Sequence, residues 1–223
     1  MISNRYQFRA VREWSNQEIR KIAPFCKGDI VNVSAGDDED KEGNYYKDYF
    51  LNAKSYSMTN WNAGEFRGYK ERENEYLLDL TSDLPDSYFC RFDVVLNHTT
   101  LEHIFPVQKA FLNLTLITRD LLLLIVPFSQ AQHETISFKD YWRFTPSCIR
   151  ELMHVNDLHV IYEAESPYIN SSIYLFVVGT KQPEKWKDIL PQYKDIECAG
   201  SWIGRSKKPK VSVLQKIVKF LIK

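Results

Sequence analysis

Polar side chains that could do chemistry gather directly after two apolar runs of the chain. One group, Asn97–His103, contains Glu102 and the histidines His98 and His103, and the other begins near His133. A histidine can accept a proton near neutral pH, so each could act as a base toward a hydroxyl acceptor. We predict His133 as that base, with His98 and His103 as alternatives. Each of the three could instead make a structural hydrogen bond.

The runs that precede these groups predict the elements that position them. Phe92–Leu96 is apolar and rich in β-branched residues, and Leu121–Val126 is a second apolar run, which we expect to end at Pro127. Between them, Phe105–Leu116 has apolar residues at helical spacing. Such runs without alternation are typical of parallel strands buried on both faces. The sequence therefore predicts an α/β fold with helices on both faces, and ligands bind at the carboxyl ends of such strands.

Five more segments have the composition of strands, which brings the expected sheet to seven. They are Asp29–Val33, Ser55–Met58 with its end at Asn60, Tyr76–Asp79, Leu158–Glu163 and Ser172–Gly179.

Three further segments predict helices. Ser15 and Glu18 match the S-x-x-E capping box, which predicts a short helix that begins at Ser15. We also expect a helix over Asn44–Leu51. Thr145 followed by Pro146 predicts a helix that begins there and runs to about residue 154.

The bulk composition narrows the function classes. The chain has 223 residues and a formal net charge of +0, so it offers no general attraction for nucleic acid. Its four cysteines form no CxxC pair, which favours reduced, buried thiols over a zinc site or disulfides. The first residues lack the apolar core of a signal peptide, and no run is long enough to span a bilayer. We expect a cytoplasmic protein.

Several motifs together resemble the class I, S-adenosylmethionine-dependent methyltransferases, particularly the small ones associated with bacterial surface-polysaccharide synthesis. The motifs are FDVV at 92–95, LEH at 101–103, VPF at 126–128, His133, and DYWRFTP at 140–146. The resemblance covers about residues 29 to 179. It implies a Rossmann-like, mostly parallel sheet with an antiparallel last strand, S-adenosylmethionine as cofactor, and a sugar or related small acceptor in surface-glycan biosynthesis.

The resemblance also implies which residues bind the cofactor, namely Asn32, Ser34, Gly36, Asn60, Asp79, Leu80 and Asn97. The chain departs from the family pattern at several of these positions. The family's Gly-x-Gly-x-Gly turn is degraded, since Ser34 and Asp38 replace its first and third glycines. Both acids expected near the cofactor are amides here, Asn32 and Asn60. Asp79 matches the acid that meets the adenine amino group, although it could equally cap a turn.

On the acceptor side the resemblance points to His98, Glu102, Tyr141 and Arg143. Arg143 could pair with Asp140 or bind an acidic or phosphorylated acceptor. The aromatic rings around Tyr141 could face a sugar ring or belong to an ordinary core.

Two other functions compete with methyl transfer. The lost glycines and acids suit a non-catalytic, interaction-module descendant of the fold in a glycan-assembly complex. Asp38 and Asp40 form a D-x-D pattern, by which a metal-dependent glycosyltransferase holds Mg²⁺ or Mn²⁺. We assign no metal site, because such short acidic patterns are common in solvated loops.

The domain organisation follows from these segments. Residues 1–28 form an N-terminal helical extension that either covers the cofactor or packs on the sheet edge, and residues 29–180 form the methyltransferase-like domain. Residues 181–206 form a connector. Residues 207–223 contain six lysines and no acid beside an apolar helical stripe, which predicts a helix that lies on the inner face of the plasma membrane or docks on a partner.

Overall fold

The computed structural model describes residues 5–61, 68–136, 138–167, 172–197 and 203–204. These residues form a seven-stranded sheet in the order β3-β2-β1-β4-β5-β7-β6. β1 to β5 pair in parallel, and β7 is antiparallel to both β5 and β6. The strands are β1 (Gly28–Val33), β2 (Ala53–Asn60), β3 (Glu75–Leu77), β4 (Phe92–His98), β5 (Thr118–Ser129), β6 (His159–Glu165) and β7 (Ile173–Thr180). The predicted Rossmann-like sheet with an antiparallel last strand is confirmed.

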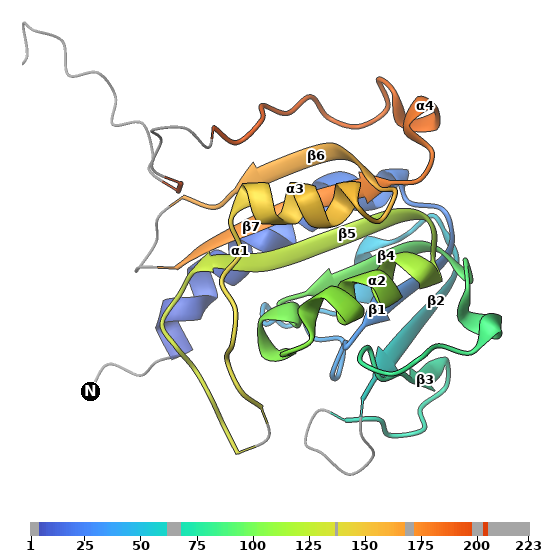
Figure 1. The fold of residues 1–223 in the computed structure, drawn as a ribbon, viewed down its shortest axis with the longest axis horizontal. Helices are drawn as coiled ribbons and strands as arrows, with labels where there is room; N and C mark the ends of the chain where they lie inside the picture. Colours follow the sequence, from blue (N-terminus) through green and yellow to red (C-terminus); the bar gives the residue numbers. More distant parts are fainter. Residues whose placement is uncertain (1–4, 62–67, 137, 168–171, 198–202, 205–223) are drawn as a thin grey trace, which may run out of the picture.

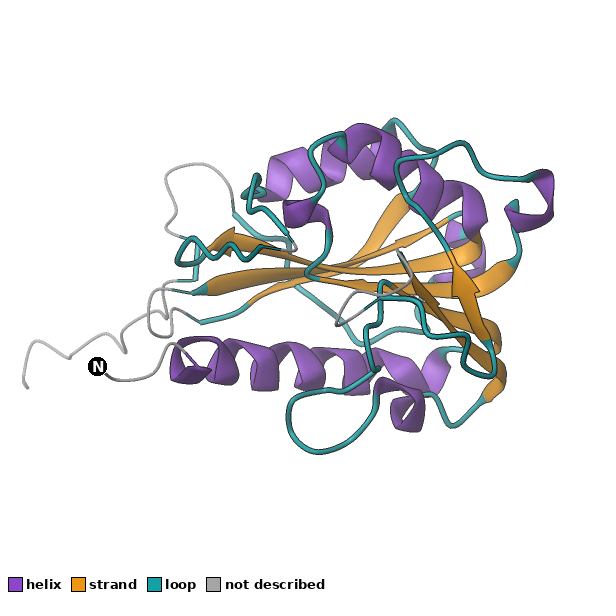
Figure 2. Cartoon of the chain, turned by 90° about the horizontal axis from the view of Figure 1, so that it is seen from below, coloured by secondary structure: helices purple, strands orange, loops and turns teal. Residues whose placement is uncertain are grey.

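Helices cover both faces of the sheet, as predicted. α1 (Arg5–Ile22) lies on one face, and α2 (Val107–Ile117) and α3 (Pro146–His154) lie on the other, while the short α4 (Pro183–Trp186) follows β7. Figure 2 shows the sheet edge-on between these two layers. Two apolar cores result, one on each side of the sheet. Among the described residues, no helix is long and apolar enough to cross a membrane.

Several predicted strand boundaries were wrong. β3 ends at Leu77 and not at Asp79, and the ends of β6 and β7 differ by one or two residues. β4 extends to His98 rather than ending at residue 96. β5 continues through Pro127 to Ser129. Proline is tolerated at this position because the pairing of β5 with β4 ends at Ile125, and the ladder with β7 is irregular between Pro127 and Ser129.

Two predicted helices were also wrong. Ser15 lies inside α1 and does not start it, since its hydroxyl donates to the carbonyl oxygen of Arg12 at 2.9 Å. The segment expected as a helix from Asn44 contains only a 3-10 turn, Tyr46–Tyr49. Asp40 explains the difference, because its carboxylate accepts the backbone N–H of Asn44 and holds this segment as a loop.

The helix predicted after Thr145 is confirmed. The Thr145 hydroxyl caps α3 by accepting the backbone N–H of Cys148 at 3.1 Å. The cysteines are only partly as expected. Cys26 is buried, but Cys90 and Cys148 are exposed.

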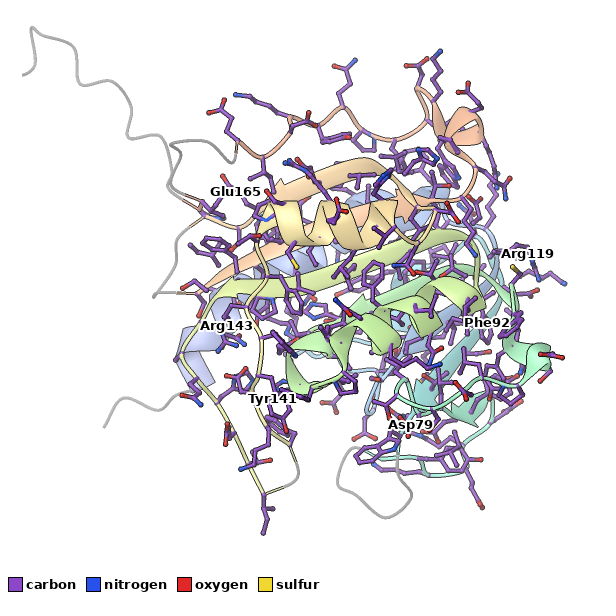
Figure 3. All side chains as sticks on the ribbon, viewed as in Figure 1. Asp79, Phe92, Arg119, Tyr141, Arg143 and Glu165 are labelled. Atoms are coloured by element: carbon purple, nitrogen blue, oxygen red, sulfur yellow. The ribbon has the colours of Figure 1, made fainter. Side chains whose placement is uncertain are left out.

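The parallel strands place their carboxyl ends at one edge of the sheet, where antiparallel β7 begins. Figure 3 shows Tyr141 and Arg143 near this edge, at the opposite end from Phe92 and Arg119 of β4 and β5. Most of the predicted site residues therefore lie at the carboxyl ends of the parallel strands.

Candidate functional site

In the loop after β1, the Asp38 carboxylate is held by side chains and backbone of neighbouring segments. The Asn32 amide donates to the Asp38 carboxylate at 2.7 Å, and Asp38 also accepts from the Tyr56 hydroxyl and the Lys47 backbone N–H. Ser34 and Asp38 have φ values of 59° and 62°, the left-handed conformation that favours glycine. Burial raises the pKa of Asp38 despite these hydrogen bonds. The acid missing at Asn32 is therefore replaced by one six residues further along the chain.

Asn60, at the end of β2, binds the backbone of this loop on both sides of its amide. Its Oδ1 accepts the Gly36 N–H at 2.7 Å, and its Nδ2 donates to the Gly36 carbonyl at 3.0 Å and to Glu75 Oε1 at 2.6 Å. Arg72 donates to the same carbonyl at 2.7 Å. Both polar atoms of Asn60 are thus engaged within the chain, so in this arrangement neither is directed to a ligand.

Glu75 is the acid that accompanies the amide at position 60. Its fully buried carboxylate pairs with the Arg72 guanidinium at 2.9 Å and accepts the backbone N–H groups of Lys70 and Arg72. Burial acts to raise the pKa of Glu75, but the hydrogen bonds from Arg72 and Asn60 outweigh it and lower the pKa to about 2. Arg72 and Lys70 also bind Asp37 at 2.7 Å each, which ties the β1 loop to the segment before β3.

Asp79 and Leu80, both predicted to bind the cofactor, have different environments in the structure. Asp79 caps a turn, since its carboxylate accepts the Thr81 N–H and hydroxyl at 2.7 Å and the Ser82 hydroxyl at 2.9 Å. Burial acts to raise the pKa of Asp79, but these hydrogen bonds hold it below its ordinary value. Leu80 packs in the core, and its carbonyl accepts from Asn113. Only Asp79 therefore offers a partly accessible polar group.

Asn97 lies at the carboxyl end of β4 and is fully buried. Its Nδ2 donates to the Val33 carbonyl of β1 at 3.1 Å. Its Oδ1 accepts no hydrogen bond from the described part of the chain. An unsatisfied buried acceptor costs free energy, so this atom is suited to a ligand donor.

His98 is held on both ring nitrogens. Ser15 donates its hydroxyl hydrogen to a backbone carbonyl, so it accepts from His98 Nε2 at 2.8 Å, and Nδ1 accepts from Arg12 at 2.7 Å. Burial and the Arg12 charge keep the pKa of His98 well below its ordinary value. His98 is therefore a neutral, fixed imidazole and has no ring nitrogen left for a base.

Glu102 is a buried carboxyl group, 1% exposed, in the turn after β4. Its carbonyl oxygen accepts the backbone N–H of Tyr141 at 2.7 Å and that of Trp142 at 3.2 Å, which fixes the second polar stretch beside the first. Its Oε2 has no partner among the described groups. Burial raises the pKa of Glu102 to about 8, although Arg12 acts in the opposite direction.

His133 and Arg143 meet at one carboxylate. Asp140 binds Arg143 through two hydrogen bonds of 2.6 and 2.7 Å, which is the structural pair expected from the sequence. The same carboxylate accepts the His133 backbone N–H and lies 3.5 Å from His133 Nδ1. The His133 ring packs edge-to-face on His103, with 4.9 Å between ring centroids. The His133 side chain is a third exposed and its Nδ1 lies near the Asp140 carboxylate, so it is better placed than His98 or His103 to act as a base.

Tyr141 forms part of an aromatic surface next to this histidine. Its ring contacts Phe105, with centroids 5.3 Å apart, and Phe105 also stacks on Trp142. Phe105 is 66% exposed and Tyr141 is 48% exposed. Flat apolar rings of this kind can bind a planar or sugar-like ligand face.

The acidic D-x-D residues do not share a site. Asp38 faces Asn32, whereas Asp40 binds Arg20 and Tyr49. Among the described residues, no cluster of three acids, histidines or cysteines could hold a metal ion.

Sequence reasoning missed Arg12, Arg72 and Glu75. Arg12 could have been found, because it lies at helical spacing with Ser15 and Ile19 on the buried stripe of α1. Arg72 and Glu75 lie in a polar stretch that reads as an exposed loop, and nothing local marks either as buried.

Comparisons with known proteins agree on the fold. No family model matches the sequence, and no curated protein matches it. Among solved structures, the 1,6-didemethyltoxoflavin-N1-methyltransferase of Burkholderia thailandensis is similar, with a TM-score of 0.52 and 16% identity over 81% of this chain and 91% of that one. Magnesium protoporphyrin IX methyltransferase of Synechocystis has a TM-score of 0.51 and 9% identity, over 79% and 81% of the two chains.

A protein with a different reaction has the same fold. The [4+2]-cyclase SpnF has a TM-score of 0.53 and 9% identity over 75% of this chain and 80% of that one. The strand order, the antiparallel β7 and these similarities together give one conclusion: the chain has the Rossmann-like fold of the class I S-adenosylmethionine-dependent methyltransferases.

Proposed function

We propose that the protein is an S-adenosylmethionine-dependent methyltransferase. The observation that carries the proposal is the unsatisfied Oδ1 of Asn97, a buried acceptor at the carboxyl end of β4 in a sheet of this topology. The ammonium group of S-adenosylmethionine is a donor that would satisfy it. Similar structures contain bound S-adenosylhomocysteine in the Burkholderia enzyme and S-adenosylmethionine in the Synechocystis enzyme, which supports this choice of cofactor.

Asn97 and Asp79 could each bind the cofactor, whereas Asn60 already makes hydrogen bonds within the chain. Asn97 would hold the amino-acid part, and the Asp79 carboxylate would accept from the adenine amino group. Asn60 binds Gly36 through both amide atoms, so a ribose hydroxyl would have to displace one of these bonds. When bound, the cofactor supplies an electrophilic methyl group on a sulfonium centre.

The chain's own task is to align an acceptor and remove its proton. His133 is the proposed base, because the Asp140 carboxylate lies 3.5 Å from its Nδ1 and would stabilise the imidazolium. The exposed faces of Phe105 and Tyr141 would support the acceptor. We propose a sugar or related small acceptor in surface-glycan biosynthesis, with the protein in the cytoplasm at the inner face of the membrane.

A second candidate is a non-catalytic module with this fold. The two bonds between Asn60 and Gly36, with Arg72 on the same carbonyl, favour it, because they close the loop after β1 with the chain's own groups. The fold does not decide between the candidates, since SpnF has it and is a cyclase.

Calorimetric titration with S-adenosylmethionine and S-adenosylhomocysteine tests the proposal. We expect both to bind, Asp79→Ala to weaken both, and His133→Ala to leave both unchanged. Asp83→Ala is the matched control, because Asp83 is an exposed acid that pairs with Lys109 on α2. If neither ligand binds at millimolar concentration, where about −4 kcal/mol would register, the non-catalytic module is correct.

A further inference from the structure

Near Glu102, the positive charge of Arg12 is not balanced by a neighbouring ionised acid among the described residues. Arg12, on the largely buried side of α1, contacts only neutral groups: His98 at 2.7 Å, Thr99 at 3.1 Å and the Tyr46 hydroxyl at 3.5 Å. No carboxylate in the described part of the chain makes an ion pair with it. Arg12 is partly buried, and a charge partly withdrawn from water without a counter-charge is costly, so a compensating anion is favoured.

The same region contains unused hydrogen-bond donors. The guanidinium of Arg12 has five N–H groups, and its hydrogen bonds to the described residues use only Nη1 and Nη2, so its Nε–H is unused among them. The buried Nε2 of Gln130 also has no partner. Burial raises the pKa of Glu102 to about 8, which favours the protonated carboxyl at neutral pH, and its Oε2 has no partner among the described residues. The unused groups are therefore mainly donors.

These groups lie together at the carboxyl edge of β4, β5 and β7. Tyr174, the second residue of β7, has its ring 6.3 Å from that of His98 and donates its hydroxyl to Gln130 at 3.4 Å. Arg12 interacts electrostatically with both Tyr174 and Glu102, and Tyr174 interacts with Glu102. One small ligand group could thus contact several of them.

We propose that Arg12, Glu102, Gln130 and Tyr174 form a binding site for a carboxylate group of the acceptor. One guanidinium charge and a few neutral donors match a monoanion with two oxygens. The site lies on the β4-β5-β7 half of the sheet, whereas Gly36, Asn60 and Asp79 lie on the β1-β2-β3 half.

Asn97, which we propose for the amino-acid part of the cofactor, is the neighbour of His98 and therefore adjoins this site. We assign the carboxylate to the acceptor because Gln130 and Tyr174 lie beyond Asn97, after β5 and on β7. Only that assignment rests on the proposed methyltransferase function, and competition with S-adenosylhomocysteine tests it.

The site has a built-in dependence on pH. Above about pH 8 the Glu102 carboxyl ionises, becomes an acceptor and neutralises Arg12, so an anion should bind more weakly. The charged and titratable groups that face Glu102 are Arg12, His103, Asp140, Arg143 and Tyr174. Asp140 and Arg143 are paired with each other. Mainly through burial, the pKa of Tyr174 is raised to about 12. None of these three groups therefore changes charge near pH 8.

Acetate and the isosteric, neutral acetamide are the probes. Each is titrated into the ¹⁵N-labelled full chain while the Nε–H resonance of Arg12 and the side-chain amide resonances of Gln130 are followed by NMR. The Gln130 resonances report on Arg12→Gln, which lacks the Arg12 Nε–H. We expect saturable shifts with acetate at least tenfold tighter than with acetamide. Arg12→Gln should abolish acetate binding, and Arg20→Gln, on the same helix but paired with Asp40, should not. Equal response to both probes, or an equal loss in the two variants, overturns the proposal.

Two further arms complete the test. Glu102→Gln keeps a donor, so it should retain acetate binding and lose the weakening above pH 8; a variant that still weakens overturns the role of Glu102. Acetate should also bind in the presence of saturating S-adenosylhomocysteine. Displacement by that ligand assigns the site to the cofactor and overturns the acceptor site. Failure of S-adenosylhomocysteine to bind contradicts the proposed function alone, because the acetate titration does not need it.

Discussion

The Nδ2 atom of Asn60 lies 2.6 Å from the Oε1 atom of Glu75, and both side chains are buried. The resemblance to methyltransferases implies an acid at position 60, and this contact explains why the chain has an amide there. A carboxylate at 60 would face the ionised Glu75 at hydrogen-bond distance with no proton between them. The departure from the family pattern is therefore coupled to a neighbouring acid.

Asn60→Asp should destabilise the protein by roughly 2 to 4 kcal/mol, because it places two buried carboxylates side by side and removes the donor to the Gly36 carbonyl. Urea unfolding at neutral pH measures the change. Asn74→Asp, an exposed amide next to the same strand, is the control and should change stability little. Adding Glu75→Gln to Asn60→Asp should recover part of the loss. Additive losses in the double variant would contradict the coupling.

Glu75 should make stability depend on pH in the acid range. Its pKa is lowered from 4.5 to about 2 in the folded protein, so its stabilising contribution is complete above about pH 5 and is lost as pH falls toward 2. At about 1.4 kcal/mol per unit this is about 3 kcal/mol. The difference in unfolding free energy between wild type and Glu75→Gln, measured by urea titration, should shrink by that amount across this range. A constant difference would show that Glu75 is not specially stabilised when ionised.

The strands could be predicted because their signal is local. Apolar runs marked the central strands β4 and β5, the composition of the other segments marked the rest, and only the strand ends were misplaced. Pro127 looked like a terminator because proline cannot donate to a ladder, yet β4 no longer pairs with β5 at that point. Helix α1 was predicted too short, because the polar residues Arg12 and Ser15 on its inner stripe bind His98 at the sheet edge instead of solvent.

The candidate site could be predicted only in outline. Positions 32 and 60 were correctly placed at the ends of β1 and β2, but the acids that accompany them, Asp38 and Glu75, become neighbours only through folding of the loops between. The Asp140 and Arg143 pair was predictable because it is three residues apart. Arg12 and Glu102 are 90 residues apart in sequence, and only the packing of α1 on the sheet brings them together.

The C-terminal segment 207–223 lies outside the described residues, so its membrane contact remains a proposal. Deleting it should abolish sedimentation with anionic vesicles and leave the urea midpoint of the core unchanged, because its lysines supply roughly 1 kcal/mol each near such a surface. Replacing its six lysines with glutamine separates charge from the apolar stripe and should also release the protein. Unchanged sedimentation after deletion would favour docking on a partner.

Glu102 should lower stability as pH rises, which is opposite in sign to Glu75. Its pKa is raised from 4.5 to about 8 by burial, so the folded state keeps a proton that the unfolded state releases between these values. Stability is full below about pH 4.5 and falls until about pH 8, by about 3 kcal/mol at pH 7. Glu102→Gln removes this loss, so its advantage over wild type should be larger by that amount at pH 7 than at pH 4, in thermal or urea unfolding. The exposed Glu151→Gln control should show no such trend. If the Glu102→Gln difference does not change with pH, the carboxyl is ionised in the folded protein and paired with Arg12, and the unbalanced charge on which the carboxylate site depends does not exist.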